Sequence, residues 1–131
     1  QGKIDNPLLP IDELAEKWKG NQDLPSGGEN QEIDVPGFKT LVFRANQTSQ
    51  KVNFYNPEEN ECLFKLKLYA NDKQLWESGY IQPSDGYYDI EISDPLDVGE
   101  YDGKLIYQCY KDDGTQLNSA VVTFKLIVKE Q

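Results

Sequence analysis

From Glu32 onward, hydrophobic and polar residues alternate in short runs that Gly, Pro, Asn and Asp clusters separate. Alternation with a period of two indicates strands with one buried face, and several short strands in a row are typical of an antiparallel sandwich. We therefore expect a β-sandwich domain over residues 32–131, preceded by a leader or linker over residues 1–31. The pattern predicts seven strands, at residues 38–44, 51–55, 62–69, 74–77, 87–93, 100–110 and 119–129.

Residues 10–19 of the leader predict one short helix. The segment has proline at its start, acidic residues in the first turn, lysines in the last turn and Gly20 as its stop. A helix of about two turns is marginal alone, so we expect it to persist only if its apolar face docks on another surface. That face would carry Ile11, Leu14 and Trp18.

The last hairpin allows a prediction of strand register. If Asp113 and Gly114 form a two-residue turn, Tyr110 lies opposite Leu117. All the inner positions of the two strands then share one face, with large residues opposite small ones. The predicted inner pairs are Tyr101 with Leu126, Gly103 with Phe124, Leu105 with Val122, and Tyr107 with Ala120.

The segment Asp97-Val98-Gly99-Glu100-Tyr101 resembles the Asp-x-Gly-x-Tyr element of immunoglobulin-like domains. The resemblance implies an Ig-like sandwich in which Tyr101 forms a tyrosine corner, with a structural role. Antibody domains place a cysteine where this chain has Gly103. The chain more closely resembles uncharacterised Ig-like modules of exported and surface proteins of Gram-positive gut bacteria. Stretches that carry this resemblance are residues 35–38, 53–62, 76–83, 99–107 and 117–120.

The resemblance implies an extracytoplasmic module of unknown activity. Such a module would follow a signal peptide or membrane anchor in the full-length sequence. The start at Gln1 agrees with removal of such a segment. We therefore expect an extracellular or cell-surface anchored protein. The apolar stretches have strand length, far below the roughly 20 residues of a membrane-spanning helix.

Composition narrows the chemistry that the 131 residues could perform. The chain has no histidine, which excludes Ser-His-Asp and Cys-His nucleophiles and imidazole-ligated metals. Its net charge of −10, without a basic run, argues against nucleic-acid binding. We expect neither an enzyme nor a cofactor.

Cys62 and Cys109 are the only cysteines. In an Ig-like sandwich the strands that carry them are antiparallel neighbours, and alignment of their apolar phases places the two residues opposite each other. A disulfide would then be within reach, although an opposed pair in a flat ladder is often strained. Two buried thiols acting as small hydrophobes are the alternative. The same register pairs Phe64 with Tyr107, Leu66 with Leu105, and Leu68 with Gly103.

Aromatic residues in the second half of the chain could form a sugar-stacking platform. Its centre would be Trp76 with Tyr80 or Tyr87, and loop acids such as Asp85 would accept hydrogen bonds from sugar hydroxyls. Strands favour Tyr and Trp in any case, so core and rim packing is the alternative. Residues expected to point inward, and so to lie outside the platform, are Tyr88, Tyr101 and Tyr107.

Acidic turns could hold calcium, although no EF-hand spacing is present and solvated turns are the usual explanation. The candidates are Asp94, Asp97 and Glu100 at one corner, and Asp112 with Asp113 in the last turn.

The outward positions of the sheet suggest a partner, because several are apolar. We expect the leader helix, with Trp18, to cover this face, either from the same chain or from a neighbouring one; scattered surface apolar residues are the alternative. The predicted function is a noncatalytic structural or adhesive module that binds a protein partner or itself. The alternative is a carbohydrate-binding module that calcium could assist. The apolar residues of the predicted interaction face are Leu63, Ile106, Tyr110, Val121 and Ile127, which alternate with lysines.

Overall fold

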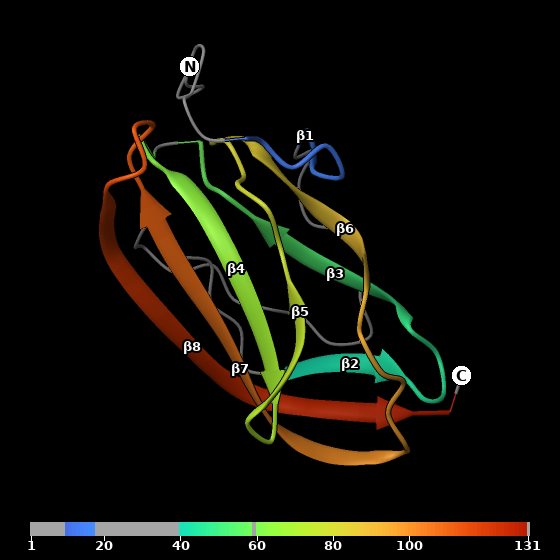
Figure 1. Cartoon of the computed structure of the whole chain (residues 1–131). Coiled ribbons are helices and arrows are strands. Elements are labelled where there is room, and N and C mark those ends of the chain that lie inside the picture. Colours follow the sequence, from blue (N-terminus) through green and yellow to red (C-terminus); the bar gives the residue numbers. More distant parts are fainter. Residues whose placement is uncertain (1–9, 18–39, 59, 131) are drawn as a thin grey trace.

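The computed structural model describes residues 10–17, 40–58 and 60–130, and within them it is all-β, with eight strands and no helix (Figure 1). A three-stranded sheet has the order β1-β6-β3, and a five-stranded sheet has the order β2-β8-β7-β4-β5. The predicted all-β class is confirmed. The strands are β1 (Glu16–Lys17), β2 (Thr40–Arg44), β3 (Ser49–Tyr55), β4 (Leu63–Ala70), β5 (Lys73–Glu77), β6 (Asp85–Glu91), β7 (Gly99–Tyr110) and β8 (Gln116–Lys129).

The β7–β8 hairpin has the predicted register from Gly99 to Gln108. Gly103 lies opposite Phe124 and Tyr107 opposite Ala120, so small residues leave room for large ones across the ladder. The turn itself differs from the prediction. The Lys111 amide donates to the Thr115 carbonyl at 2.8 Å, which makes the loop longer than two residues. A register shift follows, and Tyr110 pairs with Gln116 instead of Leu117.

The predicted β4–β7 register is wrong by two residues. Cys109 lies opposite Phe64, and Leu105 lies opposite Leu68. A slip of two residues keeps every side chain on its own face, so the apolar phase that led to the prediction cannot distinguish the two registers. The observed register is held at the β4–β5 turn, where Asn71 and Asp102 exchange two hydrogen bonds of 2.8 Å each.

The core lies between the two sheets. Phe54 of β3 and Tyr87 of β6 come from the three-stranded sheet, and their rings contact Trp76 of β5 with centroid distances of 5.8 and 5.1 Å. The sheets therefore pack face to face in a sandwich-like arrangement. Among the largest fully buried side chains are Phe43, Phe64, Leu66, Leu68, Leu105, Tyr107 and Leu126.

The predicted helix is wrong for the described part of its segment, residues 10–17. A turn at Glu13 and Leu14 precedes the short strand β1, and Leu14 is 82% exposed. The Asp12 carboxylate accepts a hydrogen bond from the Leu14 amide at 2.9 Å, which closes this turn in place of a helical one. Residues 18 and 19, and with them Trp18, lie outside the described residues.

Candidate functional site

The candidate site is the side of the five-stranded sheet that faces away from the core, which we call the outer face. Along each strand its side chains alternate with the buried ones. The outer face comprises Lys65, Lys67 and Tyr69 of β4, Gln74 and Glu77 of β5, Lys104, Ile106, Gln108 and Tyr110 of β7, and Val121, Thr123, Lys125 and Ile127 of β8.

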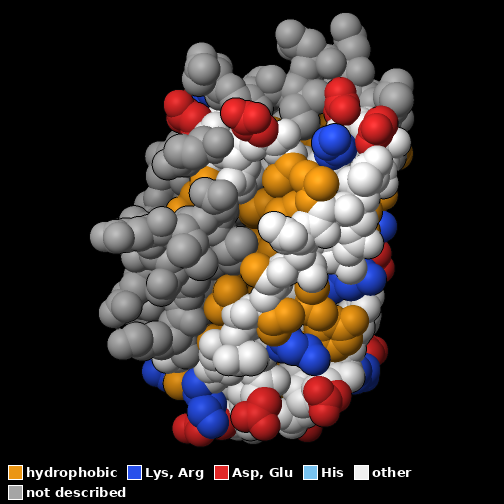
Figure 2. Space-filling model, turned by 90° about the vertical axis from the view of Figure 1, so that its left-hand side faces the viewer, with side chains coloured by type: hydrophobic (Ala, Val, Ile, Leu, Met, Phe, Trp, Pro, Cys, Tyr) orange, Lys and Arg blue, Asp and Glu red, His pale blue; other side chains and the backbone are white. Residues whose placement is uncertain are grey.

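Apolar residues of the outer face lie in the middle of its ladders. Ile106 pairs with Lys67 on one side and with Val121 on the other, and Val121 is 55% exposed. Ile127 is half-buried beside Val42 of β2. Figure 2, which shows the side of the molecule where β8 lies in Figure 1, has hydrophobic surface between lysine and arginine side chains. The described part of the outer face thus combines apolar surface with cationic neighbours.

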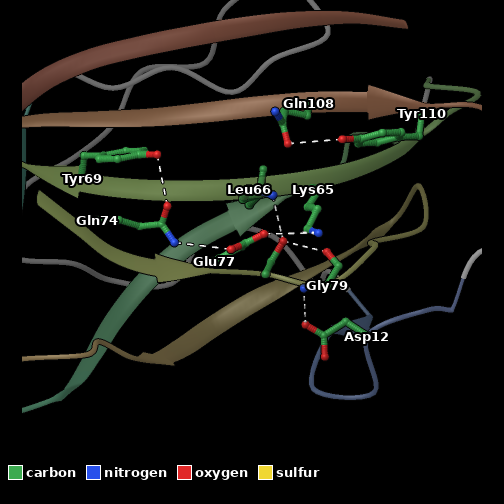
Figure 3. Close-up of polar contacts among 10 residues, drawn as sticks. Asp12, Lys65, Leu66, Tyr69, Gln74, Glu77, Gly79, Gln108 and Tyr110 are labelled. Carbon is green, nitrogen blue, oxygen red and sulfur yellow. Dashed lines mark hydrogen bonds and ion pairs between the residues drawn. The ribbon is translucent and has the colours of Figure 1, made fainter. Parts of the chain in front are cut away.

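Hydrogen bonds join polar side chains across β4 and β5 (Figure 3). The Tyr69 hydroxyl donates to Gln74 Oε1 at 3.1 Å, and Gln74 Nε2 donates to Glu77 Oε1 at 3.3 Å. Lys65 Nζ lies 3.2 Å from Glu77 Oε2. The hydrogen bond from Lys65 is the main cause that lowers the pKa of Glu77, so this carboxylate is charged at neutral pH.

Two tyrosine rings of this region lie beneath ammonium groups. Lys65 Nζ is 5.2 Å from the centroid of the Tyr80 ring, and Lys104 Nζ is 5.0 Å from that of Tyr69. Tyr80 also packs edge-on against Tyr110, with centroids 5.3 Å apart. These contacts place both ammonium groups over aromatic rings.

A shallow hollow of about 430 Å³ opens where β7 and β8 lie beside the β4–β5 turn. Acidic and basic side chains both line the hollow. Lys104 Nζ lies 4.0 Å from Asp72 Oδ1. The other lining residues are Asp102, Gly103, Thr123, Phe124 and Lys125.

The structure changes the predicted interaction face in one respect. Ile106, Tyr110 and Ile127 are half-buried and Val121 is exposed, but Leu63 is fully buried. Leu63 pairs with Tyr110 at the end of β4, where Tyr80 packs against Tyr110. Leu63 is therefore withdrawn from the candidate surface.

The predicted sugar-stacking residues do not share one surface. Tyr80 borders the outer face, Trp76 packs into the core, and Tyr87 is 3% exposed. Bulges account for the errors. One bulge in β5 places Leu75 and Trp76 both inward, and a shift in the β3–β6 register makes Tyr87 rather than Tyr88 the core residue.

Gln74 was not predicted as a site residue, and Tyr69 was expected only as one of the aromatic residues in the second half of the chain. The signal was present, because Asn71-Asp72 is a two-residue hairpin turn with positive φ at both positions, 48° and 68°. Such a turn pairs Ala70 with Lys73 and brings Tyr69 opposite Gln74, as the structure has it.

Cys62 and Cys109 are both thiols in the structure, and both are half-buried. The observed register explains why they are not opposed, since Cys109 faces Phe64 and Cys62 precedes the first residue of β4.

Tyr101 makes a hydrogen bond of the kind expected for a tyrosine corner, and the acidic residues considered for calcium lie in ion pairs, hydrogen bonds or exposed turns. The Tyr101 hydroxyl donates to the Asp97 carbonyl at 2.9 Å. Asp94 pairs with Lys73 at 2.7 Å, and Glu100 lies 3.8 Å from Lys125. Within the described residues no three potential metal-ligating side chains come together. Asp85 is 9% exposed, and Asp113 accepts a hydrogen bond from the Thr115 amide at 2.9 Å while Asp112 is exposed in the same turn.

Comparison with protein families, curated proteins and solved structures finds no match to this chain. No helix in the described ranges is long and apolar enough to cross a membrane.

Proposed function

We propose that this chain is a noncatalytic binding module that attaches to a protein partner through the outer face of its five-stranded sheet. The observation that carries the proposal is the row Lys67–Ile106–Val121, which places apolar side chains in the centre of a sheet face. Apolar residues in such a position are costly to leave in water, whereas contact with a partner buries them. Lysines around them would orient an encounter with a partner that carries acidic groups.

The Ig-like type of sandwich belongs to the same proposal. Its support is the strand order β2-β8-β7-β4-β5, the parallel pairing of β2 with β8 and the hydrogen bond from Tyr101 to Asp97. An exported or surface-displayed location rests on the resemblance of the sequence to exported modules of Gram-positive bacteria. Loops and faces of such sandwiches carry binding, while the two sheets supply a rigid frame.

Carbohydrate binding is the second candidate, and one observation favours it. Tyr69, Gln74 and Glu77 form a hydrogen-bonded row of one ring and two planar polar side chains on the outer face. Such groups combine stacking with hydrogen bonds to hydroxyls, the two contacts that a sugar ring offers. A carbohydrate site on the outer face would not include Trp76 and Tyr87, because both belong to the core.

A charged substitution on the outer face should reduce binding to the partner and leave the protein folded, so it tests the proposed surface. Val121→Glu introduces a carboxylate into the apolar row, and Val98→Glu is its matched control because Val98 is equally exposed, 56% against 55%, but lies in the turn before β7. Wild type and both variants are screened against panels of immobilised surface proteins and a glycan array. Melting curves verify that both variants are folded.

The proposal expects a protein ligand whose affinity falls at least about tenfold in the Val121→Glu variant and stays within about twofold in the Val98→Glu variant. Binding that survives the Val121 change, or that the Val98 change removes equally, contradicts the proposed surface. A ligand found on the glycan array alone, lost with Gln74→Ala, replaces the protein partner with the carbohydrate.

A further inference from the structure

The N-terminal segment of the described chain is bound to the molecule as a peptide would be. Ile11 forms a parallel bridge with Tyr80, and the Asp12 amide donates to the Tyr80 carbonyl at 2.8 Å. Farther along, Glu16 and Lys17 pair with the first two residues of β6. The segment is thus attached through its backbone on both sides of the turn at Glu13 and Leu14, and its β1 part adds to a sheet edge, the mode by which many domains bind peptides.

Two hydrogen-bond donors hold the half-buried carboxylate of Asp12 in this segment. Asp12 Oδ2 accepts hydrogen bonds from the Gly79 amide at 3.0 Å and from the Tyr87 hydroxyl (Figure 3 shows the first). We call these two donors the carboxylate notch. Partial burial alone would raise the pKa of Asp12, but hydrogen bonds from Tyr87, Leu14 and Gly79 outweigh it, and the net pKa is lowered.

The notch is shaped for this contact. A Cβ atom on Gly79 would lie 2.9 Å from the Asp12 Cβ, so a larger residue at position 79 would push the segment away. Tyr87 is 3% exposed, and burial together with its bond to Asp12 raises the pKa of its phenol, which therefore acts as a donor. The partners of Asp12 are 67 and 75 residues away in sequence.

Side-chain burial in the segment is limited to a few positions. Ala15 packs against the core and Ile11 is half-buried, but Leu14 is 82% exposed. The segment is joined to β2 by the 22 residues from 18 to 39. A chain of that length spans at most about 75 Å when extended, which is enough to reach the same edge of a neighbouring molecule.

We propose that the β6 edge and the carboxylate notch form a binding site for a peptide with an Ile-Asp-x-x-Ala pattern, and that its occupant in an assembly is this segment of a second copy of the chain. An identical copy presents the same complementary segment, so exchange creates an interface without new contacts. Because the segment and the site belong to one chain, the cis segment has a high effective concentration, so exchange needs crowding or a weakened cis contact. This site borders the outer face at Tyr80, but the proposal does not depend on the function proposed above.

Two full-length variants test the exchange by complementation. Asp12→Asn weakens the segment and leaves the notch intact, whereas Gly79→Ala spoils the notch and leaves the segment intact. We expect their mixture, at up to about 1 mM, to give at least five times more heterodimer in native mass spectrometry than either variant gives homodimer. The matched control is a mixture of Glu13→Gln with Gly79→Ala. Because Glu13 is exposed, this mixture should give no such excess of heterodimer.

A synthetic peptide of residues 8–19 provides a second measurement, on the Asp12→Asn chain. The peptide should bind, and its own Asp12→Asn form should bind at least about tenfold more weakly, whereas its Glu13→Gln form should not. Equal binding of all three peptides, or no binding, overturns the carboxylate notch as a recognition site. Peptide binding without heterodimer at any concentration overturns the second copy as the occupant.

Discussion

Substitution of Gly103 by alanine tests the packing between β7 and β8. A Cβ atom on Gly103 would lie 2.2 Å from Phe124 Cε2 and 2.6 Å from Cδ2 and Cζ, where carbon atoms normally approach to about 3.5 Å. The Phe124 ring would have to move by more than about 1 Å in a site where Phe124 is 8% exposed. Overpacking of this kind costs about 1–3 kcal/mol, and the entropy that alanine saves in the unfolded chain offsets about 0.5–1 kcal/mol. We expect Gly103→Ala to lower the free energy of unfolding by about 1–2 kcal/mol.

The assay is urea unfolding followed by tryptophan fluorescence, in a double-mutant cycle with Phe124→Leu. Leucine lacks the Cε2 and Cζ atoms that the new Cβ would meet, so the alanine should cost at least about 1 kcal/mol less in that background. Additive effects of the two substitutions, or a neutral Gly103→Ala, would refute the argument that the ring lies over Gly103.

Three further predictions concern single side chains. Tyr101→Phe removes the hydrogen bond to the Asp97 carbonyl and should lower the free energy of unfolding by about 0.5–1.5 kcal/mol; no change in the urea midpoint would contradict this. Cys62 and Cys109 should both react with a thiol reagent in denatured protein purified without reductant, and no reaction would mean that they are bridged. Because the pKa of Asp12 is lower in the folded than in the unfolded state, its contribution to stability is present above pH about 4 and disappears as pH falls through the folded value. The stability gap between wild type and Asp12→Asn should therefore shrink between pH 7 and pH 3, and a constant gap would contradict this assignment.

The strands could be predicted because their signals are local. Alternation placed seven of the eight described strands, and the last hairpin fixed its own pairing because Gly103 and Ala120 must face large residues. The β4–β7 register could not be predicted in the same way, since a slip of two residues leaves the buried set unchanged. Two hydrogen bonds between Asn71 and Asp102 accompany the observed register, and alternation contains no trace of them.

The predictions for the N-terminal segment and for the aromatic site were wrong for a different reason. Local helix signals around Asp12 were overridden by Gly79 and Tyr87, which are distant in sequence. Bulges in β5 and along the β3–β6 ladder reversed the expected side of Tyr87 and drew Trp76 inward, and no simple period reveals a bulge. The outer face was largely predictable because most of it follows from alternation alone, with Leu63 the exception.

Lysine footprinting of the complex tests the proposed binding surface most directly. Free protein and protein saturated with the ligand from the screen are acetylated under mild conditions, and the rate at each lysine is measured by mass spectrometry. Lys67, Lys104 and Lys125 of the outer face should be protected, while Lys51, which pairs with Asp89 on the three-stranded sheet, should react at an unchanged rate. Protection of Lys51 with unchanged rates on the outer face would contradict the proposed binding surface.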